Sequence, residues 1–181
     1  MKGDWLQIWG DDHWFDADIL NNLLARDVDI VVPLCTYRKA PYHYVHYKQK
    51  ADGTYGTIQH DSMPDPTLCP LLEVERSGFA GAVIKRHVFE AIKAPWFEYG
   101  PPLPGRERWK ITGEDVSFSD KVIAAGFKIM VDLEHPIGHM FQAAVLPKWN
   151  GREMVLDFRC GSDVEELVEL PQQYFLDKGF K

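Results

Sequence analysis

Residues 5–34, WLQIWGDDHWFDADILNNLLARDVDIVVPL, decide the fold. The stretch opens with the apolar run Trp5–Trp9, which ends at a glycine and predicts a short buried strand. After an acidic turn, four apolar residues at helical spacing predict a helix with one buried face: Ile19, Leu20, Leu23 and Leu24. A second apolar run at 29–34 predicts another buried strand. Strand, loop, helix and strand in this order are typical of an α/β layer.

The later chain continues this pattern and predicts a mixed sheet flanked by helices. Further strands are expected at 71–75 and 127–131, and a helix is expected to open near Glu114 and to end at Gly126. The small-residue run 78–84 leads into another predicted helix, which carries apolar residues at 88–92. The fold class that follows is α/β.

Local signals refine these elements. Asp16 or Asp18 is expected to cap the first helix with its side chain. The aromatic run Tyr42–Tyr47 predicts an edge strand, and two glycines predict turns, Gly53 and Gly56. In the tail, the capping box from Ser162 to Glu165 predicts a short helix.

Composition narrows the class of protein. The 181 residues fit one domain, and 20 Lys and Arg against 27 Asp and Glu give a net charge of −7. This charge argues against nucleic acid and against an anionic membrane surface as partner. Three well-separated cysteines predict free thiols in a reducing compartment: Cys35, Cys69 and Cys160. No apolar run approaches the roughly 18 residues that span a bilayer, so we expect a soluble, cytoplasmic protein.

The acidic turn Asp11-Asp12-His13 is the first candidate site. It follows the carboxyl end of a predicted strand, where open α/β sheets bind ligands. Adjacent carboxylates beside an imidazole suit a divalent cation such as Mg²⁺ or Mn²⁺. The alternative is a plain turn whose acids cap the following helix.

Three further candidates have equally plain alternatives. Glu114 and Asp115 open a predicted helix, where they serve either as a general base or only as partners of the helix dipole. His139 follows a strand and is either a ligand or a structural histidine. Arg38, among tyrosines, either binds a phosphate or sugar or lies on a solvated edge.

Taken in order, these signals resemble a known family. Three segments carry the resemblance: IWGDDHWFDADILNNLLARDVDIVVPLCTYRKAP at 8–41, SGFAGAVIKRHVFEAIKAPWF at 77–97 and TGEDVSFSDKVIAAGFKIMVDLEHPIGHM at 112–140. They are similar to the motifs of GT-A fold glycosyltransferases, in the bacterial and phage type close to glycosyltransferase family 2. The resemblance covers residues 4 to 140, and 141–181 resemble nothing recognised.

The resemblance implies a metal site at the acidic turn, which corresponds to the family's D-x-D motif. In one register Asp12 holds the metal and Gly10 replaces the first Asp of the motif. In the other, Asp11 and His13 form a D-x-H motif. His139 matches the family's G-H histidine, which completes the metal shell. Mn²⁺ or Mg²⁺ is the implied cofactor.

The resemblance also implies the catalytic, donor and acceptor residues. Asp115 matches the inverting catalytic base, and Glu114 is its neighbour in the E-D pair. Trp96 would lie near the acceptor. The donor is expected to contact Gly78, Phe79, Ala80, Gly81 and Arg38.

The implied function is metal-dependent transfer of a sugar from a UDP- or GDP-linked donor to a carbohydrate or other hydroxyl acceptor, with inversion. The main alternative is a non-catalytic or fragmentary module of a larger enzyme that binds nucleotide or carbohydrate. A third hypothesis is a metal-dependent hydrolase.

The chain departs from the family at its start, because the N-terminal nucleotide-binding half of roughly a hundred residues has no counterpart here. We therefore expect a GT-A-like domain at 1–140 and an extension at 141–181 with a short helix that packs on the same domain. The strand at 5–9 would then have one unpaired flank, so we expect the extension to cover it or a homodimer to form.

Overall fold

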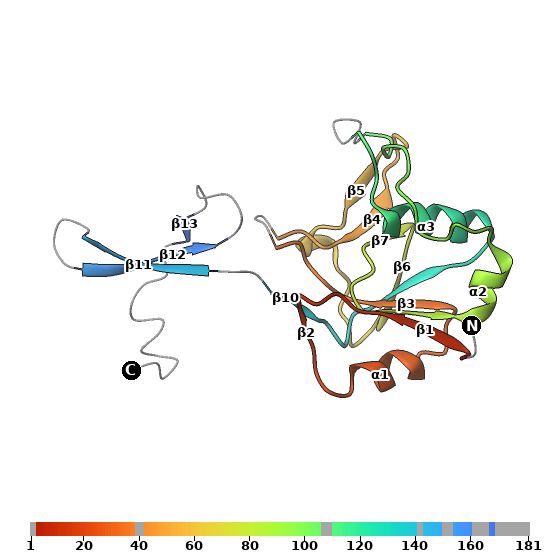
Figure 1. Ribbon diagram of the computed structural model, residues 1–181, viewed down its shortest axis with the longest axis horizontal. Coiled ribbons are helices and arrows are strands. Elements are labelled where there is room, and N and C mark those ends of the chain that lie inside the picture. Colours follow the sequence, from red (N-terminus) through yellow and green to blue (C-terminus); the bar gives the residue numbers. More distant parts are fainter. Residues whose placement is uncertain are drawn as a thin grey trace. The chain divides into compact units, whose positions relative to one another are not determined.

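A computed structural model describes residues 3–38, 42–105, 110–140, 143–149, 154–160 and 167–168 of the chain. The chain divides into two compact units (Figure 1). The first comprises Met1–Tyr37 and Tyr42–His139, and the second comprises Arg38–Pro41 and Met140–Lys181. All candidate site residues except Arg38 therefore belong to the first unit.

A five-stranded mixed sheet forms the centre of the first unit. Its strands, in spatial order, are β1 (Trp5–Ile8), β8 (Ala82–Lys85), β3 (Ile30–Pro33), β9 (Ile129–Asp132) and β6 (Leu71–Val74). The pair β3 and β9 is parallel, and the other three pairs are antiparallel. Among the described strands β1 lies at one edge, and what covers that edge stays a prediction.

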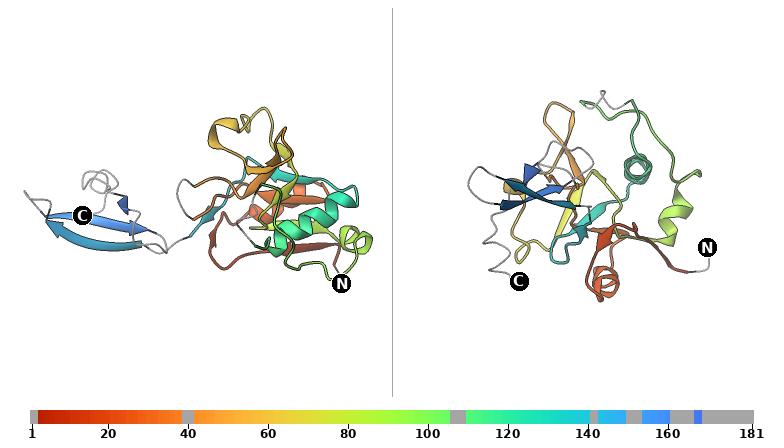
Figure 2. Two further views of the ribbon diagram at one scale, coloured as in Figure 1. Left: turned by 90° about the horizontal axis from the view of Figure 1, so that it is seen from above. Right: turned by 60° about the vertical axis from the view of Figure 1, so that its left-hand side comes forward.

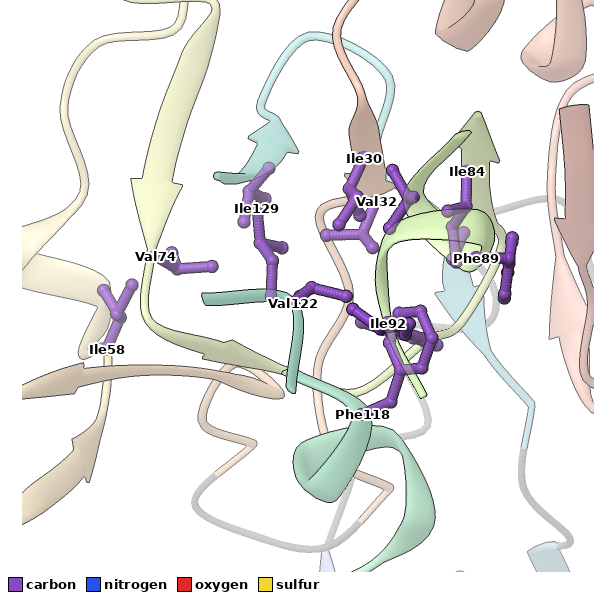
Figure 3. Close-up of a cluster of buried hydrophobic side chains, with 14 of the residues drawn as sticks. Ile30, Val32, Ile58, Val74, Ile84, Phe89, Ile92, Phe118, Val122 and Ile129 are labelled. Atoms are coloured by element: carbon purple, nitrogen blue, oxygen red, sulfur yellow. The ribbon is translucent and has the colours of Figure 1, made fainter. Parts of the chain in front are cut away.

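Helices lie on both faces of this sheet. Figures 1 and 2 show α1 on one side of the sheet and α3 on the other. On the first face, Val31 of β3 packs with Leu23 of α1. On the other face, Ile30 packs with Phe118 of α3 and Phe89 of α2 (Figure 3). The bounds are Ile19–Ala25 for α1, Arg86–Ala91 for α2 and Glu114–Ala124 for α3.

This layering follows from the apolar strands that the sequence predicts. Neighbouring residues on a strand point to opposite faces, so a strand buried on both faces must be apolar throughout. All four residues of β3 are buried. The structure is therefore a mixed α/β fold, as the sequence predicts.

A second sheet corrects the prediction for residues 42–47. Its order is β5 (Tyr55–Thr57), β4 (His46–Gln49) and β7 (Arg76–Ser77). The strand begins only at His46 and lies in the middle of the sheet, with antiparallel partners on both sides. An edge strand at 42–47 is therefore wrong, because β7, 30 residues further along, supplies the second partner.

A two-stranded antiparallel pair brings together a segment near the start of the first unit and a segment near its end. It consists of β2 (His13–Trp14) and β10 (Gly138–His139), which are antiparallel with His139 opposite His13. A single 3₁₀ turn, η1 (His60–Ser62), lies between β5 and β6. The short β2–β10 pair brings the acidic turn and the predicted metal histidine together.

Other local predictions differ in detail. Asp18 is the N-cap residue of α1, as predicted, although its side chain makes no capping hydrogen bond. Gly56 lies within β5 rather than in a turn, whereas Gly53 turns the chain with φ +83°. The run 78–84 contains the start of β8, a strand of the central sheet, before α2 begins.

The second unit is an antiparallel sheet. Its strands are β11 (Ala143–Trp149), β12 (Met154–Cys160) and β13 (Leu167–Val168), in that spatial order. The predicted capping box at 162–165 lies outside the described residues. Within the part of the chain that the structure describes, no helix is long and apolar enough to cross a membrane.

Candidate functional site

One cavity of about 750 Å³ in the first unit collects most of the predicted site residues. It lies beside the carboxyl end of β1, the start of α3 and the glycine segment before β8. Eight predicted or motif residues line it: Gly10, His13, Gly78, Phe79, Ala80, Glu114, Asp115 and His139. Segments more than a hundred residues apart in the chain thus share one cavity.

The first end of the cavity is a cluster of Asp12, His13 and His139, which we call the histidine end. The β2–β10 pairing stacks the two imidazoles, with ring centroids 4.6 Å apart and planes 26° apart. Asp12 contacts both rings. Its Oδ1 lies 3.1 Å from His13 Nδ1, and its Oδ2 lies 3.1 Å from His139 Nε2.

The hydrogen bonds of His139 show that this end favours a positive charge. Its Nδ1 lies 2.8 Å from the carbonyl oxygen of Thr36, and a carbonyl can only accept, so Nδ1 carries a hydrogen. In a neutral ring, Nε2 would then turn a lone pair toward the Asp12 carboxylate. Either a second proton on the ring or a cation between the two groups resolves this conflict.

The structure explains why glycine occupies position 10. A Cβ there would lie 2.6 Å from both Cε1 and Nδ1 of the His13 ring, closer than any real contact. The His13 imidazole therefore occupies the space that a side chain at position 10 would need. Neither aspartate of the turn lines the cavity, but Asp12 contacts both histidines, whereas Asp11 is exposed. The geometry favours the register in which Asp12 is the ligand.

The second end of the cavity is the start of α3, which we call the carboxylate end. Oδ1 of Asp115 accepts a hydrogen bond of 2.7 Å from the Val116 backbone N–H. An added Cβ at Gly113 would lie 2.9 Å from this oxygen, so that glycine makes room for the carboxylate, whereas a Cβ at Gly78 would meet Val45 first, at 3.1 Å. Burial, with a smaller contribution from the charge of Glu114, raises the pKa of Asp115 above its usual range.

Aromatic side chains line the cavity wall between these ends. Trp9, Tyr37, Tyr47, Phe79 and Phe97 all contribute. The Tyr37 and Tyr47 hydroxyls hydrogen-bond to each other. The lining contains two carboxylates, Glu114 and Asp115, and no Lys or Arg from the residues that the structure describes. The wall therefore offers ring faces and hydrogen-bonding groups but no fixed cation.

Gly81 supports this wall from behind rather than lining it. Its φ of +74° lies in the left-handed region, which favours glycine. A Cβ there would lie 2.4 Å from the Trp9 ring. Trp9 in turn stacks on Phe15 with centroids 4.2 Å apart.

Five predicted site residues do not line the cavity: Asp11, Asp12, Gly81, Arg38 and Trp96. Trp96 is exposed and packs edge to face on Phe89, with centroids 5.1 Å apart, outside the cavity lining. Arg38 is exposed and belongs to the second unit. The cavity therefore offers no basis for acceptor contact by Trp96 or donor contact by Arg38.

His46, a residue that the sequence analysis did not identify, connects the two ends through buried polar contacts. It is fully buried, and burial lowers its pKa to about 3, so the ring is neutral. Ser77 Oγ donates to the Gly78 carbonyl and lies 2.9 Å from His46 Nδ1, which therefore donates to it. His46 Nε2 accepts from the Cys35 backbone N–H at 3.4 Å.

The connection continues to the carboxylate end. The Ser77 backbone N–H donates to Ser119 Oγ at 3.3 Å, and that hydroxyl donates to the Asp115 carbonyl oxygen at 2.9 Å. An isolated histidine and two serines carry no sequence signal for such a role. Only the β4–β7 pairing, with His46 opposite Ser77, brings these groups together.

Comparisons with known proteins name no family for this arrangement. No protein-family model matches the chain, and no curated protein matches it. The chain is similar to the crystal structure of A197 from STIV, with 19% sequence identity and a TM-score of 0.47. The match covers 84% of this chain, which spans 65% of that structure's chain.

Proposed function

We propose that this chain is a metal-dependent glycosyltransferase of the GT-A type, transferring a sugar from a nucleotide-sugar donor to a hydroxyl acceptor with inversion. One observation carries the proposal. A half-buried carboxylate with a raised pKa lies at one end of the cavity, and two histidines that both contact Asp12 lie at the other. Along the chain, these residues occur in the same order as the matching motifs of the GT-A family.

Asp115 is the proposed general base. An inverting transfer needs one group that takes the acceptor's proton as its hydroxyl attacks the anomeric carbon from the face opposite the leaving group. A raised pKa makes the ionised carboxylate a stronger base toward that proton. Glu114 is exposed and lies at the cavity rim, where its charge adds to the raised pKa of its neighbour.

Asp12, His13 and His139 are the proposed ligands of the cation. A divalent cation bound there supplies neutralisation of the charge that develops on a diphosphate leaving group. Neighbouring residues hold the two histidines in place: the Thr36 carbonyl accepts a hydrogen bond from His139, and the absence of a side chain at Gly10 leaves room for the His13 ring. The single carboxylate suits Mn²⁺ or Mg²⁺, whereas the two imidazoles suit a transition ion.

The wall between the ends supports a sugar as the bound group. A pyranose ring presents C–H groups on its faces and hydroxyls on its rim, which match the ring faces of Trp9 and Phe79 and the carboxylates of the lining. A volume of about 750 Å³ lies within the range of small-molecule sites. Because the described lining has no Lys or Arg, a diphosphate would depend on the cation for its countercharge.

The same lining favours a second candidate, a non-catalytic carbohydrate-binding module. A cavity with aromatic and acidic groups and no described basic residue suits a neutral sugar better than an anionic nucleotide. This candidate predicts sugar binding that needs neither cation nor nucleotide.

Asp115→Asn tests the proposed function. The amide keeps the shape but cannot accept a proton, so transfer from UDP- or GDP-sugars should fall by about 10²–10⁴-fold while donor binding persists. Asp61→Asn, an exposed carboxylate outside the cavity, is the control and should transfer at the wild-type rate. If Asp115→Asn transfers sugar at the wild-type rate, Asp115 is not the general base. Release of free sugar in place of transfer would favour a hydrolase, and cation-independent sugar binding without turnover would favour the binding module.

A further inference from the structure

Cys35 lies directly behind the histidine end, and neither the sequence analysis nor the proposed mechanism uses it. It follows β3 and is 1% exposed. Its Sγ and the nearest ring nitrogens of His13 and His139 all lie within 4.8 Å of one another. Asp12 lies outside this group of three, but its carboxylate contacts both rings and is the fourth candidate ligand.

The chemistry of this group differs from that of a magnesium site. Mg²⁺ takes oxygen ligands in an octahedral shell, and here a single carboxylate contacts two imidazoles and a thiol. Thiolate and imidazole together are the ligands that Zn²⁺ and similar borderline ions prefer. Bond lengths of about 2.0–2.3 Å in a tetrahedral shell put donor atoms roughly 3.3–3.6 Å apart. The sulfur and the two ring nitrogens, which lie within 4.8 Å of one another, would have to approach by up to about 1.5 Å.

The surroundings hold the donors for such an ion. A metal-binding histidine usually donates its second ring N–H to a carbonyl or carboxylate, as His139 does to the Thr36 carbonyl. Thr36 is the neighbour of Cys35, so one short segment after β3 orients the histidine and supplies the sulfur. The Cys35 backbone N–H is fixed in turn by His46.

The four side chains differ in solvent exposure: three are largely buried and one is more accessible. Cys35 is 1% exposed, and the side chains of His13 and His139 are 7% and 17% exposed. The Asp12 side chain is 31% exposed and faces solvent more than the others. Three inner donors with one more accessible position are typical of zinc sites that exchange a ligand with substrate or water.

We propose that the ion at this turn is Zn²⁺ or a similar borderline transition ion, bound by Cys35 Sγ together with His13, His139 and Asp12, and not Mg²⁺. The inference rests on the proposed function in taking the same site, but its test measures the metal rather than sugar transfer. Without metal, burial raises the pKa of the Cys35 thiol to about 11, so the group is protonated and its proton leaves to solvent when the ion binds. The alternative is a small apolar residue in the α1 core, where Cys35 also packs.

Cobalt substitution tests the sulfur ligand on the full chain. Co²⁺ bound by a thiolate shows an intense charge-transfer band in the near ultraviolet, and a tetrahedral site shows strong visible bands. We expect both bands in a Cys69→Ser, Cys160→Ser double variant, in which Cys35 is the sole thiol. Because this variant leaves the site itself unchanged, the spectrum decides even if substitutions at Cys35 fail to fold.

A matched pair of variants measures the contribution of the sulfur. Cys35→Ser should lose the charge-transfer band and weaken Zn²⁺ binding in competition with a chromophoric chelator by at least about 10-fold. Cys69→Ser, at a half-buried free thiol outside the group, should match wild type. Cys35→Ala, which keeps a small apolar side chain in the core, repeats the measurement if the serine variant is unstable.

Several outcomes overturn the inference. They are Co²⁺ binding without a thiolate band in the double variant, equal Zn²⁺ affinity of Cys35→Ser and wild type, or Mg²⁺ binding as tight as Zn²⁺ binding. Failure of the proposed function is a separate result. If the chain shows the thiolate band but transfers no sugar, the proposed transferase function fails and the metal site stands. If magnesium drives sugar transfer and Cys35→Ser leaves that transfer unchanged, the metal site fails and the transferase function stands.

Discussion

The two ends of the cavity are built in opposite ways. At the carboxylate end, Glu114 and Asp115 are neighbours in sequence and open one helix, so local structure alone brings them together. At the histidine end, Asp12, Cys35 and His139 come from three segments separated by up to 127 positions. The first end needs one turn of helix, and the second needs the whole central sheet.

This difference indicates which kind of substitution should disrupt each end of the cavity. The carboxylate end depends on side-chain chemistry, because its backbone follows from the start of α3. The histidine end depends on the loops that carry it, since small shifts in β2, β3 or β10 separate its donors. Changes that perturb packing should therefore weaken the histidine end first and leave the carboxylate end in place.

We expect the largest effect in the pH dependence of sugar transfer, which tests Asp115 as the proposed base. In the proposed mechanism transfer needs ionised Asp115, and because burial raises its pKa, kcat/KM should be lost as pH falls at higher values than for an ordinary aspartate. Glu114→Gln should shift this limb downward, since it removes a charge that raises the pKa, and Asp115→Asn should abolish the limb together with about 10²–10⁴ of the rate. A pH–rate profile of the three proteins measures both effects. An unchanged limb in Asp115→Asn would assign it to another group.

Next comes the ion pair beneath the histidine end. Asp132 is fully buried and accepts bonds of 2.8 and 3.1 Å from Arg26, and it also accepts from the Glu134 and His135 backbone N–H groups in the loop before His139. Arg26→Ala removes the cation from this buried carboxylate, which then keeps only its hydrogen bonds with Glu134 and His135, and should lower the free energy of unfolding by about 3 kcal/mol. Denaturant unfolding measures this loss.

The control for that pair is Lys128→Ala, whose ion pair with Glu73 is exposed and should contribute less than about 1 kcal/mol. The pH dependence gives a second check. Burial raises the pKa of Asp132, but the hydrogen bonds of Arg26 and His135 outweigh it and hold the pKa below its usual value. The pair's stabilisation should therefore be present at neutral pH and disappear as pH falls below the ordinary aspartate range. Equal losses in both variants would contradict the assigned importance of the buried pair.

A smaller effect separates the two neighbouring aspartates of the turn. Asp12→Ala removes the carboxylate that contacts both histidines and should weaken cation binding, and cation-dependent nucleotide binding, by about 10–100-fold. Asp11→Ala removes an exposed side chain outside the cavity and should bind as wild type does. Calorimetric titration with Mn²⁺ or Zn²⁺, with and without UDP, compares them. If Asp11→Ala has the larger effect, the D-x-H register holds.

The smallest effect concerns the glycine of the turn. Gly10→Ala puts a methyl group 2.6 Å from the His13 ring, so the ring must move and metal affinity should fall by up to about 10-fold. Gly138→Ala is the matched control in β10, where the nearest contact of a Cβ is an ordinary 3.6 Å. Both variants should keep the pKa-dependent behaviour of Asp115. Equal affinities in the two variants would show that the His13 ring does not need its position against Gly10.

Sequence reasoning worked best where one local signal decides the outcome. Hydrophobic periodicity correctly identified α1, β3 and α3, each of which buries apolar residues. It also located β1 and β6, although β1 is half-buried throughout rather than buried and β6 is buried only at Val74. It missed β8, because the small residues at 78–84 are compatible with several backbone conformations. It misplaced the strand near residue 45, because strand limits depend on partners that lie 10 and 30 residues away.

The sequence by itself determined the α/β class and the chemistry on offer: paired acids at a helix start, an Asp-His turn and a glycine-rich segment. These follow from residue type and short spacing, which the chain specifies directly. Tertiary structure alone decided which of those residues share a cavity. It brought Cys35 and His46 close to the histidine end and left Trp96 exposed outside the cavity, because contacts between distant segments depend on sheet order and register, which no local pattern encodes.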